Sequence, residues 1–195
     1  WTPGPEDLLQ YLVERCGVLQ EPTMEELEFR HPSFQDYLAA KRVLQEEHYN
    51  LLIDNAHDAL YQDVMMMAVG QAQSNSKVQG RLLEGLLRRC DTEFAAVARQ
   101  LSLLALACIA DVGMVDPRWT AAIQHRTKEL LPPRDTAEAR TVATGAFVLD
   151  LLADVAKHPD RLRPGEAAAT VHAARLIDPD DPTARVIMRG IARHR

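Results

Sequence analysis

The sequence lacks the long apolar segments that identify secreted and membrane-spanning proteins. No uninterrupted apolar run in its 195 residues approaches the roughly 20 residues of a membrane span. The chain begins at Trp1, without an initiator methionine and without the basic-then-apolar pattern of a secretory signal. We therefore expect a cytoplasmic protein with no membrane partner, and we expect this sequence to be part of a longer polypeptide.

Cysteine is scarce and shows no regular spacing. Cys16, Cys90 and Cys108 are odd in number, far apart and set in helical contexts. This excludes a disulfide framework and a zinc-binding pattern. We expect three buried free thiols in a reducing compartment, because unpaired cysteines are among the most buried residues.

Sequence motifs of enzymes and metal sites are also missing. Gly80 and Gly85 have the spacing of a phosphate loop, but Leu86 and Leu87 follow where Lys and Ser or Thr are required. The sequence has no G-x-G-x-x-G, G-x-S-x-G or H-E-x-x-H motif. No histidine lies three or four residues from another histidine or a cysteine, so metal-ligand spacing is absent. We expect no catalytic residues, no bound metal and no enzymatic activity in this chain.

The charge balance argues against a nucleic-acid partner. The net charge is −6, and a predicted helix over residues 5–16 carries Glu6, Asp7 and Glu14 against Arg15. A helix that reads a DNA groove needs the opposite charge.

The sequence predicts a mainly α-helical protein with a short β-hairpin near its N-terminus. The helix over 5–16 should stop at Gly17, which tolerates a left-handed backbone. Two short strands follow at Val18–Gln20 and Glu26–Arg30, with a turn at Glu21–Thr23. Helix followed by hairpin is how a winged-helix domain ends, and we interpret the hairpin as the wing.

Helices are predicted for the rest of the chain. Apolar spacing and Pro, Gly and Asp boundaries place them at about 33–47, 57–70, 78–90, 93–112, 117–131, 135–157, 165–177 and 182–193. Three adjacent methionines, Met65 to Met67, predict a helix buried on more than one side. We divide the chain into residues 1–31, the end of a winged helix, and residues 32–195, an α-helical domain.

A weak internal repeat bears on how these helices pack. Residues 106–112 resemble residues 149–155, an offset of 43 residues that suits two-helix HEAT-like units. Alanine-rich amphipathic helices also resemble one another without any repeat. A HEAT-like array and a compact bundle are both compatible with the pattern.

The segment from Phe29 to Ala40 is the one stretch that suggests chemistry. His31 precedes Pro32, which suits the first position of a helix. A helix N-terminus offers free N–H groups and a positive dipole to a phosphate. Alternatively, the His31 ring marks only the helix start and packs on the hairpin. Phe34, Tyr37 and Leu38 keep helical spacing and are predicted to be core residues.

The same segment resembles a known family. Residues 29–40 (FRHPSFQDYLAA) match the F-x-H-x-[ST]-F-Q-E-[YF]-[LF]-A-A motif of NACHT-type STAND nucleotide triphosphatases, which include the NOD-like receptors and bacterial relatives. Asp36 stands where the family has Glu. Residues 9–19 (LQYLVERCGVL) resemble the family segment that precedes the motif, and nothing beyond Lys77 carries a family signature.

The resemblance implies a regulatory role. In the family this segment closes the winged-helix part of the NTPase, and the histidine at the position of His31 contacts the β-phosphate of bound ADP. The phosphate-loop and Walker B segments lie upstream in the family and are absent here. The resemblance therefore implies one wall of a nucleotide site, with no cofactor in this chain and ATP, ADP or GTP in an intact parent.

Two functions remain open from the sequence. The first is a non-catalytic sensor segment whose partner is the upstream NTPase core of the same polypeptide. The second is an independent helical-repeat adaptor for protein–protein interaction. A protein ligand and a second copy of the chain are the further partners that either function allows.

Overall fold

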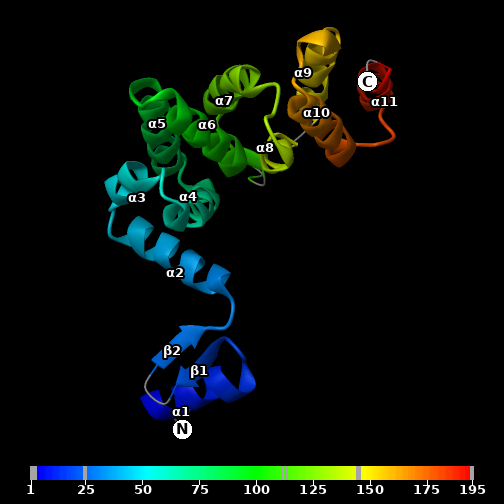
Figure 1. Cartoon of the computed structure of the whole chain (residues 1–195). Coiled ribbons are helices and arrows are strands. Elements are labelled where there is room, and N and C mark those ends of the chain that lie inside the picture. Colours follow the sequence, from blue (N-terminus) through cyan, green and yellow to red (C-terminus); the bar gives the residue numbers. More distant parts are fainter. Residues whose placement is uncertain (1–3, 24–25, 111, 113, 144–145, 194–195) are drawn as a thin grey trace.

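The protein consists of a small helix–hairpin unit, one bridging helix and a helical array (Figure 1). The computed structural model describes residues 4–23, 26–110, 112, 114–143 and 146–193. The predicted class is confirmed: the chain is mainly α-helical, with a two-stranded antiparallel hairpin near its N-terminus followed by an array of helices.

The helix predicted for residues 5–16 is present, but only its first part is α-helical. Helix α1 covers Pro5–Gln10, and a π-helical segment, η1, continues it over Tyr11–Arg15. The backbone N–H of Cys16 bonds to the carbonyl of Tyr11 at 3.0 Å, five residues back. Gly17 follows with φ of 61°, the left-handed conformation that ends the helix where the sequence predicts.

The hairpin pairs β1 (Leu19–Thr23) with β2 (Glu26–Phe29), and Leu19 lies opposite Phe29. The turn predicted at Glu21–Thr23 is wrong, because those residues belong to β1. The pairing is irregular between Gln20 and Thr23. Pro22 lies in this irregular part, where a residue without an N–H is tolerated.

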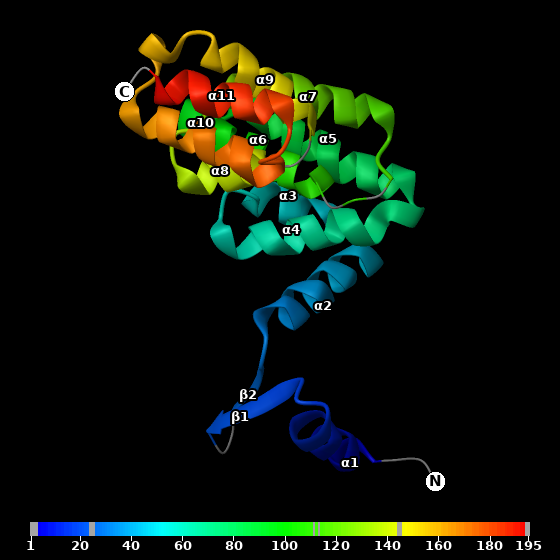
Figure 2. The ribbon, with the colours of Figure 1, turned by 90° about the vertical axis from the view of Figure 1, so that its right-hand side faces the viewer.

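Helix α2 (Pro32–Gln45) joins the hairpin to the array (Figures 1 and 2). It touches β2 at one end and packs along α4 and α3 at the other. Its buried residues, Ala40 and Val43, both lie in its second half. The first half of α2 therefore stands between the two parts of the molecule with little cover from either.

The array contains the remaining helices. Their bounds are α3 (Tyr49–Asn55), α4 (Ala59–Gln71), α5 (Ser76–Thr92), α6 (Ala95–Ala110), α7 (Pro117–Leu130), α8 (Thr136–Val142), α9 (Ala146–Ala156), α10 (Pro164–Ile177) and α11 (Pro182–Ala192). Short 3-10 turns lie at Ala72–Ser74 (η2) and Pro159–Arg161 (η3).

Most of these helices start at residues that the sequence marks. Proline occupies the first turn of α1, α2, α7, α10 and α11, where its missing N–H has no partner to lose. The carboxylates of Asp58, Asp116, Asp135 and Asp181 cap α4, α7, α8 and α11 by accepting hydrogen bonds from first-turn N–H groups.

The helices form two layers. The even-numbered helices pack in the order α2, α4, α6, α8 and α10. In the odd-numbered layer α3 packs on α5, α5 on α7, and α9 on α11. Figure 1 shows the even-numbered helices on the inner side of a shallow arc. This is the packing of a helical array, in which an element contacts its near neighbours in sequence.

The proposed 43-residue repeat does not coincide with this array. Its first copy lies mainly in α6, in the even-numbered layer, whereas its second copy lies in α9, in the odd-numbered layer. The two segments are not at equivalent positions. Chance similarity between alanine-rich amphipathic helices explains the resemblance better.

Two helix predictions needed correction. Helix α3 was not predicted; it has only 7 residues, and the N-cap residue His48 makes no side-chain capping bond. The single helix predicted for 135–157 is two helices, because Ala143 leaves the helical conformation with ψ of 50°. Residues 111, 144 and 145, which the predictions placed inside helices, lie outside the described residues.

The core runs through the array. Met65 is fully buried in α4, and Met66 and Met67 pack against the same core, as expected for a helix buried on more than one side. Helices α3 and α5 approach closely at Gly85. A Cβ atom there would lie 2.9 Å from Ile53 Cγ1 and 3.1 Å from its Cγ2. Only glycine fits this crossing without displacement of the neighbour.

Candidate functional site

His31 caps the N-terminus of α2. Its backbone is extended (φ −125°, ψ 122°), and Pro32 occupies the first turn. The ring nitrogen Nδ1 accepts a hydrogen bond from the backbone N–H of Ser33 at 3.4 Å and lies 2.6 Å from the Ser33 hydroxyl oxygen. The ring thus performs the capping role usually taken by Ser, Asp or Asn.

This capping contact assigns the two ring nitrogens different roles. An Nδ1 atom that accepts from a backbone N–H carries no proton, so a neutral ring carries its proton on Nε2. His31 is exposed, and its Nε2 makes no hydrogen bond to any residue that the structure describes. The side chain therefore offers one N–H donor beside a helix N-terminus, the arrangement that suits a phosphate oxygen.

The predicted core residues of this segment are exposed. Phe34, Tyr37 and Leu38 are 45%, 46% and 47% accessible, so the prediction that they form core is wrong. Helical spacing indicates that these residues share a face, but it does not reveal what covers that face. Here α2 leaves the hairpin before it reaches the array, and no described element covers them.

Exposed apolar side chains continue into the N-terminal unit. Leu8, Tyr11 and Leu27 are about half accessible, at 52%, 56% and 48%. We call these three residues, together with Phe34, Tyr37 and Leu38, the N-terminal apolar face. Clusters of exposed large apolar residues on proteins commonly mark surfaces that bind another protein.

A groove lies on the other side of α2, between α2, α3 and α4. Its volume is about 490 Å³. Leu51, Leu60 and Val43 provide apolar lining, while Asp36 and Asp63 provide carboxylates. We call this the α2–α4 groove. It combines an apolar floor with negative charge.

A second, smaller groove crosses the even-numbered layer. It encloses about 250 Å³ between α4, α6 and α8. Met66 and Leu103 supply apolar surface, and Gln62, Gln100 and Thr141 supply uncharged polar groups. This inner groove lies on the layer that Figure 1 shows on the inside of the arc.

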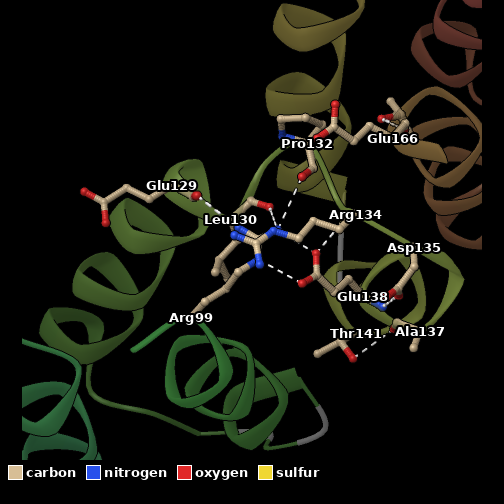
Figure 3. Close-up of polar contacts among 11 residues, drawn as sticks. Arg99, Glu129, Leu130, Pro132, Arg134, Asp135, Ala137, Glu138, Thr141 and Glu166 are labelled. Carbon is tan, nitrogen blue, oxygen red and sulfur yellow. Dashed lines mark hydrogen bonds and ion pairs between the residues drawn. The ribbon is translucent and has the colours of Figure 1, made fainter. Parts of the chain in front are cut away.

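The most extensive polar cluster is one that the sequence did not reveal. Arg99 of α6 donates from Nε to one carboxylate oxygen of Glu138 of α8 at 2.8 Å, and from Nη2 to the other at 2.5 Å. Nη2 also bonds to the carbonyl oxygens of Leu130 at 2.7 Å and Pro132 at 3.3 Å (Figure 3). The two charged side chains are only 12% and 14% accessible.

This cluster is a structural clamp. The Arg99 guanidinium lies at the C-terminal end of α7, where a positive charge satisfies free carbonyls and the helix dipole. Glu138 also accepts the backbone N–H of Arg134 at 2.8 Å. Burial opposes ionisation of Glu138, but the bonds from Arg99 and Arg134 outweigh it and lower the pKa of the carboxyl. Because these charged and backbone groups bond to one another, the cluster holds the connection between α7 and α8 against α6.

Arg89 of α5 performs a similar function at the end of α3. Its Nη1 donates to the carbonyl oxygens of Ile53 and Asp54, both at 2.8 Å, and its side chain pairs with Glu93. Two arginines in successive helices thus close the C-terminal ends of two odd-numbered helices. The isolated arginines of a sequence do not reveal which carbonyls they will reach.

The cysteines differ from one another. Cys90 and Cys108 are buried, as predicted, and burial raises the pKa of both thiols, that of Cys108 to about 12. Cys16 is exposed, so the prediction of three buried thiols is wrong at this position. It lies at the end of η1, where the small N-terminal unit has no core to enclose it.

Neither a metal-ligand cluster nor a bilayer-spanning helix is found in the part of the chain that the structure describes. In that part, no three His, Cys, Asp or Glu side chains are arranged to hold a metal ion. None of its helices combines the length and apolar character needed to cross a bilayer.

The fold and these surfaces define a class: a two-layer α-helical array joined through one helix to a small helix–hairpin unit. Comparison of the chain with protein-family models, with curated proteins and with solved structures gives no match. Its function must therefore be inferred from its own residues and surfaces.

Proposed function

We propose that the chain is a non-catalytic regulatory segment of a NACHT-type STAND nucleotide triphosphatase. Residues 1–31 supply the end of a winged helix that packs on an upstream NTPase core, and residues 32–195 supply a helical sensor surface. The segment itself is not an enzyme and binds no nucleotide, whereas the intact cytoplasmic protein binds ATP, ADP or GTP.

The observation that carries this proposal is the N-terminal apolar face. Six large apolar side chains, three in the small helix–hairpin unit and three in the first half of α2, are about half exposed. Burial of such surface contributes about 25 cal/mol for each Å² removed from water. A protein surface that covers this face is therefore strongly favoured, and an NTPase core of the same polypeptide would provide it.

The geometry of His31 supports the same proposal. Its Nδ1 is engaged by Ser33, so the donor available to a ligand is Nε2, which lies at the positive end of the α2 dipole. A phosphate held between an upstream core and this helix would receive the Nε2–H donor and the favourable helix dipole. The chain supplies one wall of that site, and the phosphate loop belongs to the core.

The first experiment measures nucleotide binding by the isolated chain. Calorimetric titration with ADP and ATP is expected to give no heat of binding, because the phosphate loop is absent. An affinity in the low micromolar range would contradict the proposal.

The second experiment uses the intact polypeptide. His31→Ala is expected to speed release of bound ADP and raise basal activity, and His48→Ala, a change at another exposed histidine, serves as the matched control. Unchanged ADP retention and basal activity in His31→Ala would remove the phosphate role and leave His31 as a helix cap.

A second function is favoured by the inner groove. Met66, Leu103 and the flanking amides provide apolar contacts and hydrogen-bonding groups on one continuous surface, which suits an independent adaptor that binds a protein partner. The coding sequence upstream of Trp1 separates the two functions. An in-frame phosphate loop supports the NTPase segment, and its absence supports the adaptor.

A further inference from the structure

Charge is distributed unevenly along the chain. Residues 32–75, which include α2, α3 and α4, contain 6 Asp and Glu against 2 Lys and Arg, whereas residues 164–195, which include α10 and α11, contain 4 against 5. Because the array follows the order of the sequence, this places negative charge at the α2–α4 end and a small excess of positive charge at the α11 end. Opposite charges at the two ends attract copies of the chain to one another end to end.

The acidic end contains a receptive surface. The α2–α4 groove includes Asp36 and Asp63, and none of its lining residues is Lys or Arg. Its apolar rim is open: Leu60 is 78% accessible and Leu51 is 46% accessible. The groove therefore suits a segment that presents an aliphatic side chain together with cationic ones.

The basic end contains such a segment. Helix α11 buries Ala184, Ile187 and Ile191 against the array. Its outer face carries Val186, which is 66% accessible, and the exposed arginines Arg185, Arg189 and Arg193. Of these arginines, Arg185 pairs with Asp180, whereas Arg189 and Arg193 form no ion pair with any residue that the structure describes.

A single molecule cannot join these two surfaces. Figure 1 shows α11 at the opposite end of the array from α2, α3 and α4. The surface whose chemistry complements the outer face of α11 is the α2–α4 groove, and a second copy of the chain can present that groove to α11.

We propose that α11 of one copy docks in the α2–α4 groove of another, so that the arrays associate head to tail. Val186 packs against Leu60 and Leu51, and the guanidinium groups of Arg189 and Arg193 pair with Asp36 and Asp63. The two surfaces are different, so the interface is heterologous, and each added copy leaves one groove and one α11 free. Assembly therefore produces open chains or closed rings.

The association is weak and depends on salt. A contact made by one face of one 11-residue helix is smaller than the roughly 1,200 Å² of a stable interface. Exposed ion pairs are screened by salt. Sedimentation velocity is expected to show the mean mass rising with protein concentration at low salt and returning to the monomer value at high salt.

Two charge-reversal variants test the interface. Arg189→Glu with Arg193→Glu makes both ends acidic, and Asp36→Lys with Asp63→Lys makes both ends basic. Each variant is expected to weaken self-association by at least tenfold while leaving the circular dichroism spectrum and thermal midpoint unchanged. Mixing the two variants restores opposite charges at every junction and is expected to restore association.

A matched control separates the site from net charge. Lys77→Glu with Arg88→Glu, both exposed on α5, changes the net charge by the same amount as the arginine variant but touches neither surface. This control is expected to retain self-association more fully than the arginine variant.

Four results would overturn the proposal. A monomer at every concentration and salt excludes the interface, and association that survives both variants places the contact elsewhere. Loss of association in the aspartate variant alone means that the groove receives a segment other than α11. Failure of the mixture to associate means that the two surfaces do not meet.

Discussion

The clamp formed by Arg99 and Glu138 provides the sharpest test of how the array is held together. Each charged side chain is almost fully enclosed and is the counterion of the other, in addition to the bonds that both make to backbone groups. Removing one partner leaves a buried charge without its counterion, which typically destabilises a protein by about 3 kcal/mol or more. We therefore expect Arg99→Met and Glu138→Gln each to lower the free energy of unfolding by about 3 kcal/mol.

The double variant distinguishes a specific pair from two independent defects. The double variant Arg99→Met with Glu138→Gln contains neither charge, so no buried charge is left unpaired. Its loss of unfolding free energy should therefore be smaller than the sum of the two single losses by about 1–3 kcal/mol. Urea unfolding followed by circular dichroism measures all three values. Additivity within about 0.5 kcal/mol would refute the coupling.

An exposed pair serves as the control for this cycle. Lys157 and Asp154 are 68% and 70% accessible, so Lys157→Met should lower the unfolding free energy far less than Arg99→Met does. A control loss as large as that of Arg99→Met would show that charge removal in general, and not the clamp, determines the effect.

The same pair predicts how stability depends on pH. The pKa of Glu138 is lowered in the folded protein. Its contribution is therefore complete above the unfolded carboxyl pKa of about 4.3 and is lost as the pH falls below that value through the folded pKa. Stability of the wild type should fall more steeply with acidification than that of Glu138→Gln, and equal slopes in urea titrations below about pH 4.3 would contradict this.

Two further predictions concern packing and thiols. Gly85→Ala should destabilise the protein by about 1–3 kcal/mol through overpacking at the α3–α5 crossing. Gly70→Ala, where a Cβ meets nothing within 4 Å, should stabilise it by up to about 1 kcal/mol. Thermal unfolding of the two variants measures both effects, and equal shifts in the thermal midpoint would contradict close packing at the α3–α5 crossing. In native protein a thiol reagent should modify exposed Cys16 rapidly and buried Cys90 and Cys108 only after denaturation. Rapid modification of more than one thiol, or reaction that persists in Cys16→Ser, would contradict this assignment.

Local sequence signals predicted where most elements lie. Proline at the first turn and aspartate caps are effects of neighbouring residues, so Asp116 with Pro117 and Asp181 with Pro182 could be interpreted from the sequence directly. Gly17 likewise stopped the first helix for a local steric reason. The short α3 was missed because its formation depends on burial of Tyr49, Leu52 and Ile53 in the array and not on its own caps.

The candidate site could be predicted only in part. The position of His31 at a helix N-terminus follows from Pro32 beside it. The exposure of Phe34, Tyr37 and Leu38 does not, because periodicity gives a shared face and not its partner. The clamp between Arg99 and Glu138 joins residues 39 positions apart, and only the packing of α6 on α8 brings them together.

The way helix α2 connects the helix–hairpin unit to the array has a mechanical consequence. The 14 residues of α2 span about 21 Å, and it contacts β2 as well as α3 and α4. The helix therefore links the helix–hairpin unit to the array. A change in the angle between α2 and α4 would be transmitted along the helix to the helix–hairpin unit. The orientation of α2 on the array therefore determines where the hairpin and α1 lie relative to the array.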